Sequence, residues 1–147
     1  MLMQKKVVAN HTMVTEISRL VNEGTQVTFV PKGSSMLPFI RGNKDSVVLI
    51  KDENIEPLDI VLAKVGDSYV LHRILTIDND RITLMGDGNL AGKERCTRGD
   101  ILAKVIKIIK DGKQIDCTEK THKRKVIIWN KLLPVRRYLL AIYRRIF

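Results

Sequence analysis

The chain has 147 residues, of which 44% are hydrophobic and 29% are charged, and its formal net charge is +10. This hydrophobic content excludes a wholly disordered chain, and the length suits one domain with an appendage. The positive charge is uneven. Residues 120–147 hold nine Lys and Arg and no Asp or Glu, whereas the preceding residues hold 17 basic and 16 acidic side chains.

The first predicted element is a short amphipathic helix over residues 12–23, because apolar residues recur there at helical spacing and Gly24 ends the pattern. Strand patterns separated by turn residues dominate the chain from there to about residue 118. The strands are expected at residues 25–31, 46–51, 59–65, 67–77, 81–85, 101–110 and 114–117. Several short strands joined by turns predict a mainly β domain over 25–118, built as a coiled sheet or partial barrel, with a helical segment over 1–24.

The tail, residues 119–147, changes to a helical period from about Lys123, and Pro134 breaks this helix or starts a second one. Its aromatic and aliphatic stripe beside many cations is typical of a helix that lies on an anionic membrane surface. The alternative is a helix that packs its stripe on the body and leaves its charges in water. Nucleic acid is the weaker expectation, because the cations alternate with aliphatic residues rather than with stacking aromatics.

Two cysteines, Cys96 and Cys117, are too few for a disulfide framework or a metal cluster, and we expect no metal and no cofactor. One disulfide between them is an alternative, and two partly buried thiols is the simpler interpretation. The first residues fall short of a signal peptide, and no apolar run reaches the ~18 residues of a membrane span. The sequence therefore predicts a cytoplasmic location or a peripheral one at a membrane surface.

Four short motifs follow one another in the β region: GSSMLP at residues 33–38, LDIV at 58–61, LHRI at 71–74 and GDGN at 86–89. In this order they resemble the motifs of type I signal peptidases, most closely the endoplasmic-reticulum and sporulation-type branch that uses histidine as its base. The same fold is shared with self-cleaving repressor peptidases of the LexA kind. The resemblance runs from about residue 27 to 115, does not cover the tail, and implies a serine endopeptidase.

By position, the resemblance makes Ser35 the nucleophile, His72 the general base and Asp87 the acidic partner that orients His72. The chemistry is consistent with these roles. A serine hydroxyl needs a base within about 2.6–3.2 Å to take its proton, and histidine titrates close to neutral pH. A carboxylate fixes the imidazole tautomer and stabilises the imidazolium.

The residues that flank the pair are expected to contact the substrate: Gly33, Ser34, Met36, Val70 and Leu71. Gly33 stands where many relatives carry a second serine, which removes a side-chain donor for the oxyanion. Where the family continues to an Asp pair, residues 92–94 read GKE, so Asp87 or Glu94 serves as the acid or the site works as a dyad. Lys64 is a rival base that would need burial to work.

Each candidate also has a purely structural interpretation. Ser35 is a common residue type for a turn, and His72 would alone suit a strand histidine with a backbone partner. His11 and His122 lie outside the motifs and are expected to be solvated. The sequence thus predicts an endopeptidase that cleaves an extended peptide laid beside an exposed strand edge. Its alternatives are a catalytically silent peptide-binding module and a membrane-associated regulator.

Overall fold

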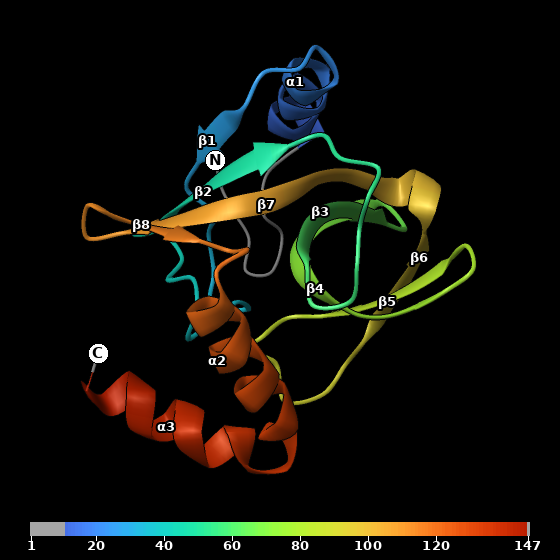
Figure 1. Cartoon of the computed structure of the whole chain (residues 1–147). Helices are drawn as coiled ribbons and strands as arrows, with labels where there is room; N and C mark the ends of the chain where they lie inside the picture. The colour runs from blue at the N-terminus through green and yellow to red at the C-terminus, as the bar shows by residue number, and fades with distance from the viewer. Residues whose placement is uncertain (1–10, 147) are drawn as a thin grey trace.

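The structure is a computed structural model that describes residues 11–146, and it is mainly β with a helix at each end (Figure 1). The strands are β1 (Val27–Phe29), β2 (Ser46–Ile50), β3 (Ile60–Val65), β4 (Ser68–Asp78), β5 (Arg81–Met85), β6 (Glu94–Thr97), β7 (Ile101–Lys110) and β8 (Lys113–Asp116). The helices are α1 (His11–Asn22), α2 (Lys120–Lys131) and α3 (Arg136–Ile146), with short 3₁₀ turns η1 (Arg98–Asp100) and η2 (Leu133–Val135).

All eight strands belong to one antiparallel sheet in the order β1-β2-β7-β3-β4-β5-β6, with β8 added beside β7. The sheet curls strongly through β3 and β4 (Figure 1). Register shifts at Val48/Leu49, Leu62/Ala63 and Ile74/Thr76 increase the local twist that such a curl requires. The predicted coiled β-sheet with a short N-terminal helix and a helical tail is confirmed.

Two apolar clusters form the core, one on each face of the curled sheet. Successive strand residues point to opposite faces, so in β3 Leu62 joins one cluster while Val61 and Ala63 join the other. The first cluster also receives α1 through Val14, Ile17 and Val21. This alternation explains why a sequence with few long apolar runs still buries both faces of β3 and the first half of β4.

Most predicted elements lie within one or two residues of those observed, and β6 is the strand that the sequence did not predict. Only Cys96 of its four residues is buried, so the segment carries no apolar alternation. Cys96 and Cys117 are free thiols, and burial raises the pKa of each to about 11.

The tail consists of two helices separated at η2, where Pro134 lies, and it packs on the body. The buried side chains are His122 and Val126 in α2, and Arg136 and Leu140 in α3. The expectation that His122 is solvated is wrong: it is 8% exposed, contacts the ring of Phe39 edge-on, and burial lowers its pKa. Among residues 11–146, no helix is long and apolar enough to cross a membrane.

Candidate active site

Ser35 lies in the irregular segment between β1 and β2, a tight turn that folds back on itself. Gly33 has φ of +88°, which favours glycine, and a Cβ at Gly42 would lie 1.8 Å from the Gly33 carbonyl oxygen. The turn also contains a cis peptide bond between Leu37 and Pro38. The backbone hydrogen bonds within the turn are donated by the N–H groups of Leu37 and later residues. The Ser35 N–H is not one of these donors.

A buried carboxylate fixes the end of this turn to the sheet. Asp45 is fully buried, accepts hydrogen bonds from the Arg41 guanidinium and backbone, and forms an ion pair with Lys110 of β7 at 3.0 Å. Burial alone would raise the pKa of Asp45, but Arg41 and Lys110 outweigh it and lower that pKa. Lys110 also donates to the Phe39 carbonyl at 2.8 Å. The Ser35 turn is therefore held against β7 by charge-assisted hydrogen bonds.

His72 is fully buried in the middle of β4, opposite Val61 of β3. Its Nδ1 lies 2.7 Å from Oε1 of Glu94, at the start of β6. Its Nε2 is buried and has no hydrogen-bond partner among the described residues. An imidazole that donates from Nδ1 to a carboxylate presents Nε2 as an acceptor, which is the state a general base requires.

The turn at residues 86–89 brings Ser35 and His72 together. The Gly88 N–H donates to the Ser35 carbonyl oxygen at 2.7 Å. A Cβ at Gly86 would lie 2.4 Å from that oxygen and 3.1 Å from Nε2 of His72, so the backbone of Ser35 and the imidazole meet at Gly86. The Ser35 hydroxyl does not hydrogen-bond Nε2 in this structure. Catalytic hydrogen bonds are often long in unliganded enzymes and tighten only with substrate bound.

Asp87 does not contact His72, which corrects its expected role as the orienting acid. Its carboxylate accepts two hydrogen bonds from Arg73, at 2.8 Å from Nε and 2.6 Å from Nη2, and both residues are less than 5% exposed. Arg73 follows His72 in β4 and so points to the opposite face of the strand. Asp87 faces Arg73, and Glu94 is the carboxylate that reaches the imidazole.

The other residues that were expected to contact the substrate do not lie in one place. Gly33, Ser35, Met36 and Leu71 line a hollow of about 10 Å³ beside the turn, hardly room for one water molecule. Val70 lies in the core cluster on the other face, and Ser34 is exposed. The hollow is therefore too small for a large side chain.

On one side of β4, the residues that precede Arg73 pair with no described strand. Residues 68–72 pair with β3 on one side, whereas pairing with β5 on the other side begins only at Arg73. Within the described residues, the backbone from Ser68 to His72 thus has no strand on that second side. Lys64, the rival base, is exposed in β3 and lacks the burial that its role needs.

Two tail residues hold the 86–89 turn, and no pattern in the sequence indicates either contact. Trp129 of α2 donates from its indole N–H to the Asp87 carbonyl oxygen at 2.8 Å. Arg136 donates to the carbonyl oxygens of Gly86 and Asn89 at 3.4 and 3.0 Å, and stacks on the Trp129 ring. The turn is thus contacted by the Ser35 segment and by the tail.

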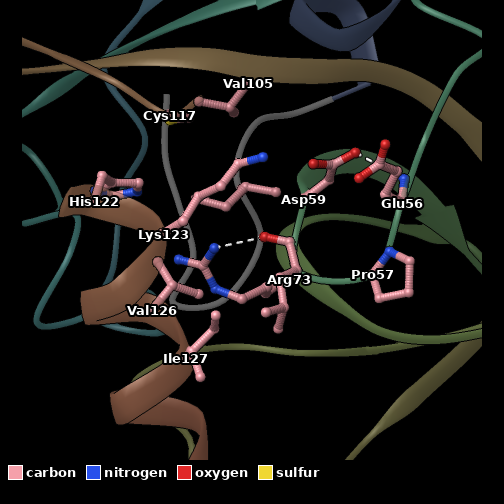
Figure 2. Close-up of a pocket in the computed structure, with 12 residues that line it drawn as sticks. Glu56, Pro57, Asp59, Arg73, Val105, Cys117, His122, Lys123, Val126 and Ile127 are labelled. Carbon is pink, nitrogen blue, oxygen red and sulfur yellow. Dashed lines mark hydrogen bonds between the residues drawn. The ribbon is translucent and has the colours of Figure 1, made fainter. Parts of the chain in front are cut away.

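A larger cavity, of about 100 Å³, lies on the Arg73 side of the sheet between residues 56–60 and α2 (Figure 2). Figure 2 shows Arg73 bonded to the Leu58 carbonyl oxygen, at 2.7 Å, with His122 and Val126 of α2 nearby. Neither Ser35 nor His72 lines this cavity, so it is separate from the candidate pair. Residues 11–146 contain no cluster of His, Cys, Asp and Glu that could hold a metal ion.

Comparison of the sequence with protein-family models gives no match, and comparison with curated protein sequences gives none either.

Proposed function

We propose that the chain is a serine endopeptidase of the signal-peptidase-like type, in which Ser35 is the nucleophile, His72 the general base and Glu94 the residue that orients His72. The observation that carries the proposal is the buried, unpartnered Nε2 of His72. A buried polar atom without a partner is costly, so its presence needs an explanation, and a catalytic role is one such explanation. This one lies against Gly86, as does the Ser35 backbone, and the other nitrogen of the ring is held by a carboxylate.

In this mechanism the Ser35 oxygen attacks the carbonyl carbon of the scissile bond while Nε2 of His72 accepts the hydroxyl proton. Glu94 stabilises the resulting imidazolium through Nδ1–H. The Ser35 backbone N–H is available to the developing oxyanion. The imidazolium then gives its proton to the leaving amine, and a water molecule activated by His72 hydrolyses the acyl-enzyme and regenerates Ser35.

The substrate that we propose is an extended peptide added as a strand along residues 68–72 of β4, whose buried residues Val70, Leu71 and His72 would have to become accessible when it binds. Main-chain hydrogen bonds would give affinity, and side-chain hollows would give specificity. The hollow beside Ser35 is very small. We therefore propose cleavage after a small residue such as alanine or glycine.

A catalytically silent peptide-binding module is the second candidate, and the absent hydrogen bond between the Ser35 hydroxyl and Nε2 favours it. Such a module would use the same strand edge and bind the same extended peptides. It would leave them intact.

The two candidates are separated by incubating the wild-type chain with a pool of peptides that carry alanine or glycine at varied positions, followed by mass spectrometry. We expect cleavage by the wild type, loss of cleavage in Ser35→Ala and in His72→Ala, and retained cleavage in the control Ser18→Ala, whose hydroxyl lies on α1. Circular dichroism establishes that each variant is folded. Cleavage that survives in both site variants, or a wild type that binds peptides and cleaves none, would overturn the mechanism.

A further inference from the structure

The helix α3 has two apolar sides, and only one of them packs on the protein. Arg136 and Leu140 point inward and are 3% and 2% exposed. On the opposite side, a stripe spaced three or four residues apart points outward. It consists of Val135 of η2 and of Tyr138, Ile142 and Ile146 of α3, with exposed fractions of 42, 63, 56 and 69%. Since Arg136 and Leu140 already make the contacts with the body, the outward stripe is not needed for docking the helix.

The helix that carries this stripe also carries exposed cations. Arg137, Arg144 and Arg145 are exposed on the same helix, and no acidic residue occurs between positions 120 and 147. An exposed apolar stripe on a helix that carries exposed arginines and no acidic residue is typical of helices that lie in the interface of an anionic bilayer. A contiguous exposed patch of large apolar side chains is unfavourable in water and is typical of an interaction surface.

We infer that α3 and the adjoining Val135 dock on an anionic lipid surface through Val135, Tyr138, Ile142 and Ile146, with Arg145 beside the stripe at the lipid head groups and Arg137 and Arg144 adding attraction at longer range. A second copy of the chain fits this face less well, because pairing two such faces would bring two sets of arginines together without an acidic partner. The helix runs along the edge of the molecule farthest from α1, so the body does not obstruct an approaching bilayer (Figure 1).

The docking itself is independent of the proposed peptidase activity. Its consequence for the active site rests on that activity: α3 carries Arg136, which holds the 86–89 turn, so a docked chain presents Ser35 and His72 at a fixed height above the bilayer. The substrates expected there are peptide segments held at the membrane surface.

The test is flotation of the purified chain on a density gradient with vesicles of phosphatidylcholine and phosphatidylglycerol in equal parts, and separately with phosphatidylcholine alone. We expect flotation with the anionic vesicles, weakened by added salt. Tyr138→Ser/Ile142→Ser should reduce partitioning by at least about tenfold, because each side chain loses its apolar contact with the acyl chains. Arg144→Gln/Arg145→Gln should reduce it about fivefold for each arginine.

The matched controls are Met13→Ser on α1, and Lys64→Gln/Arg81→Gln, which removes the same charge from the strands. Both should float like the wild type. A wild type that stays at the bottom overturns the inference, and so does equal flotation of Tyr138→Ser/Ile142→Ser. A dimer, seen by analytical ultracentrifugation, that this double variant abolishes while nothing floats would assign the face to self-association instead. Since flotation needs no cleavage, a failure here is distinct from failure of the peptidase assay.

Discussion

Two carboxylates, Asp87 and Glu94, lie near Ser35 and His72. We expect substitution of one to lower stability and substitution of the other to lower the rate of cleavage. Asp87→Asn removes the charge that faces Arg73, whereas Glu94→Gln removes the charge that faces His72. Each replacement keeps the size of the side chain and an oxygen that can accept a hydrogen bond. The two variants therefore separate a residue that stabilises the fold from a residue that orients the base.

The structure sets the size of each effect. Arg73 and Asp87 are less than 5% exposed and joined by two hydrogen bonds, so Asp87→Asn leaves a buried guanidinium without its counter-charge. Breaking such a pair lowers the free energy of unfolding by about 3–5 kcal/mol. For a chain of this length that corresponds to a melting temperature lower by roughly 10–15 °C.

The effect of Glu94→Gln should appear in the rate instead. Glu94 is 20% exposed at its side chain and makes one hydrogen bond to His72, so its loss costs about 0.5–1.5 kcal/mol of stability. An amide cannot stabilise the imidazolium as a carboxylate does, and replacement of the orienting acid in serine peptidases lowers kcat by up to about 10⁴-fold. We expect a loss of at least about 100-fold in kcat with little change in KM.

The assay is thermal unfolding by circular dichroism together with peptide cleavage, measured well below the lowest melting temperature. Asp87→Asn should show the larger loss of stability and the smaller loss of rate, and Glu94→Gln the reverse. The reasoning would be refuted by an Asp87→Asn variant that melts like the wild type and cannot cleave, beside a Glu94→Gln variant that cleaves normally.

Two further predictions concern the 86–89 turn and the tail. Gly88→Ala places a Cβ 2.4 Å from the Ser34 carbonyl oxygen, so it should displace the turn and reduce the rate of peptide cleavage. The control Gly99→Ala should be tolerated, because the nearest neighbour of its Cβ is 3.8 Å away. Equal cleavage rates for both variants would contradict this expectation. Burial lowers the pKa of His122, so below about pH 6.5 the unfolded chain binds a proton that the folded chain does not, and stability falls as the pH falls. In His122→Gln, the free energy of unfolding in urea should fall less steeply between about pH 7.5 and pH 5 than in the wild type. An unchanged slope would exclude His122 as the source of the pH dependence.

The strands were predictable because alternation and turn residues mark them directly, and the two flanking helical regions were predictable from their period. The strand β6 was not predictable, because Cys96 is its only buried residue. Since β6 carries Glu94, the position of that carboxylate was not predictable either. Choosing between Asp87 and Glu94 required knowing that Arg73 occupies the opposite face of β4 and holds Asp87 there. A sequence motif fixes the order of residues, but the face on which each side chain lies depends on strand register.

The contacts of the tail were beyond prediction for a different reason. Trp129 and Arg136 bond to backbone oxygens of the 86–89 turn, about 40 to 50 residues earlier, and backbone acceptors leave no pattern in the sequence. The helical stripe indicated where the tail is apolar. It did not indicate which side would face the body.

The turn at residues 86–89 is a shared support, because Gly88 binds the Ser35 carbonyl oxygen while Trp129 and Arg136 bind the turn from the tail. Two ligands that both favour one arrangement of a shared element must influence each other equally, as thermodynamic linkage requires. A bilayer that stabilised α3 in its present position would then raise the affinity of the chain for peptide. Bound peptide would raise the affinity for the bilayer by the same factor, so release of the product would also loosen the chain from the membrane.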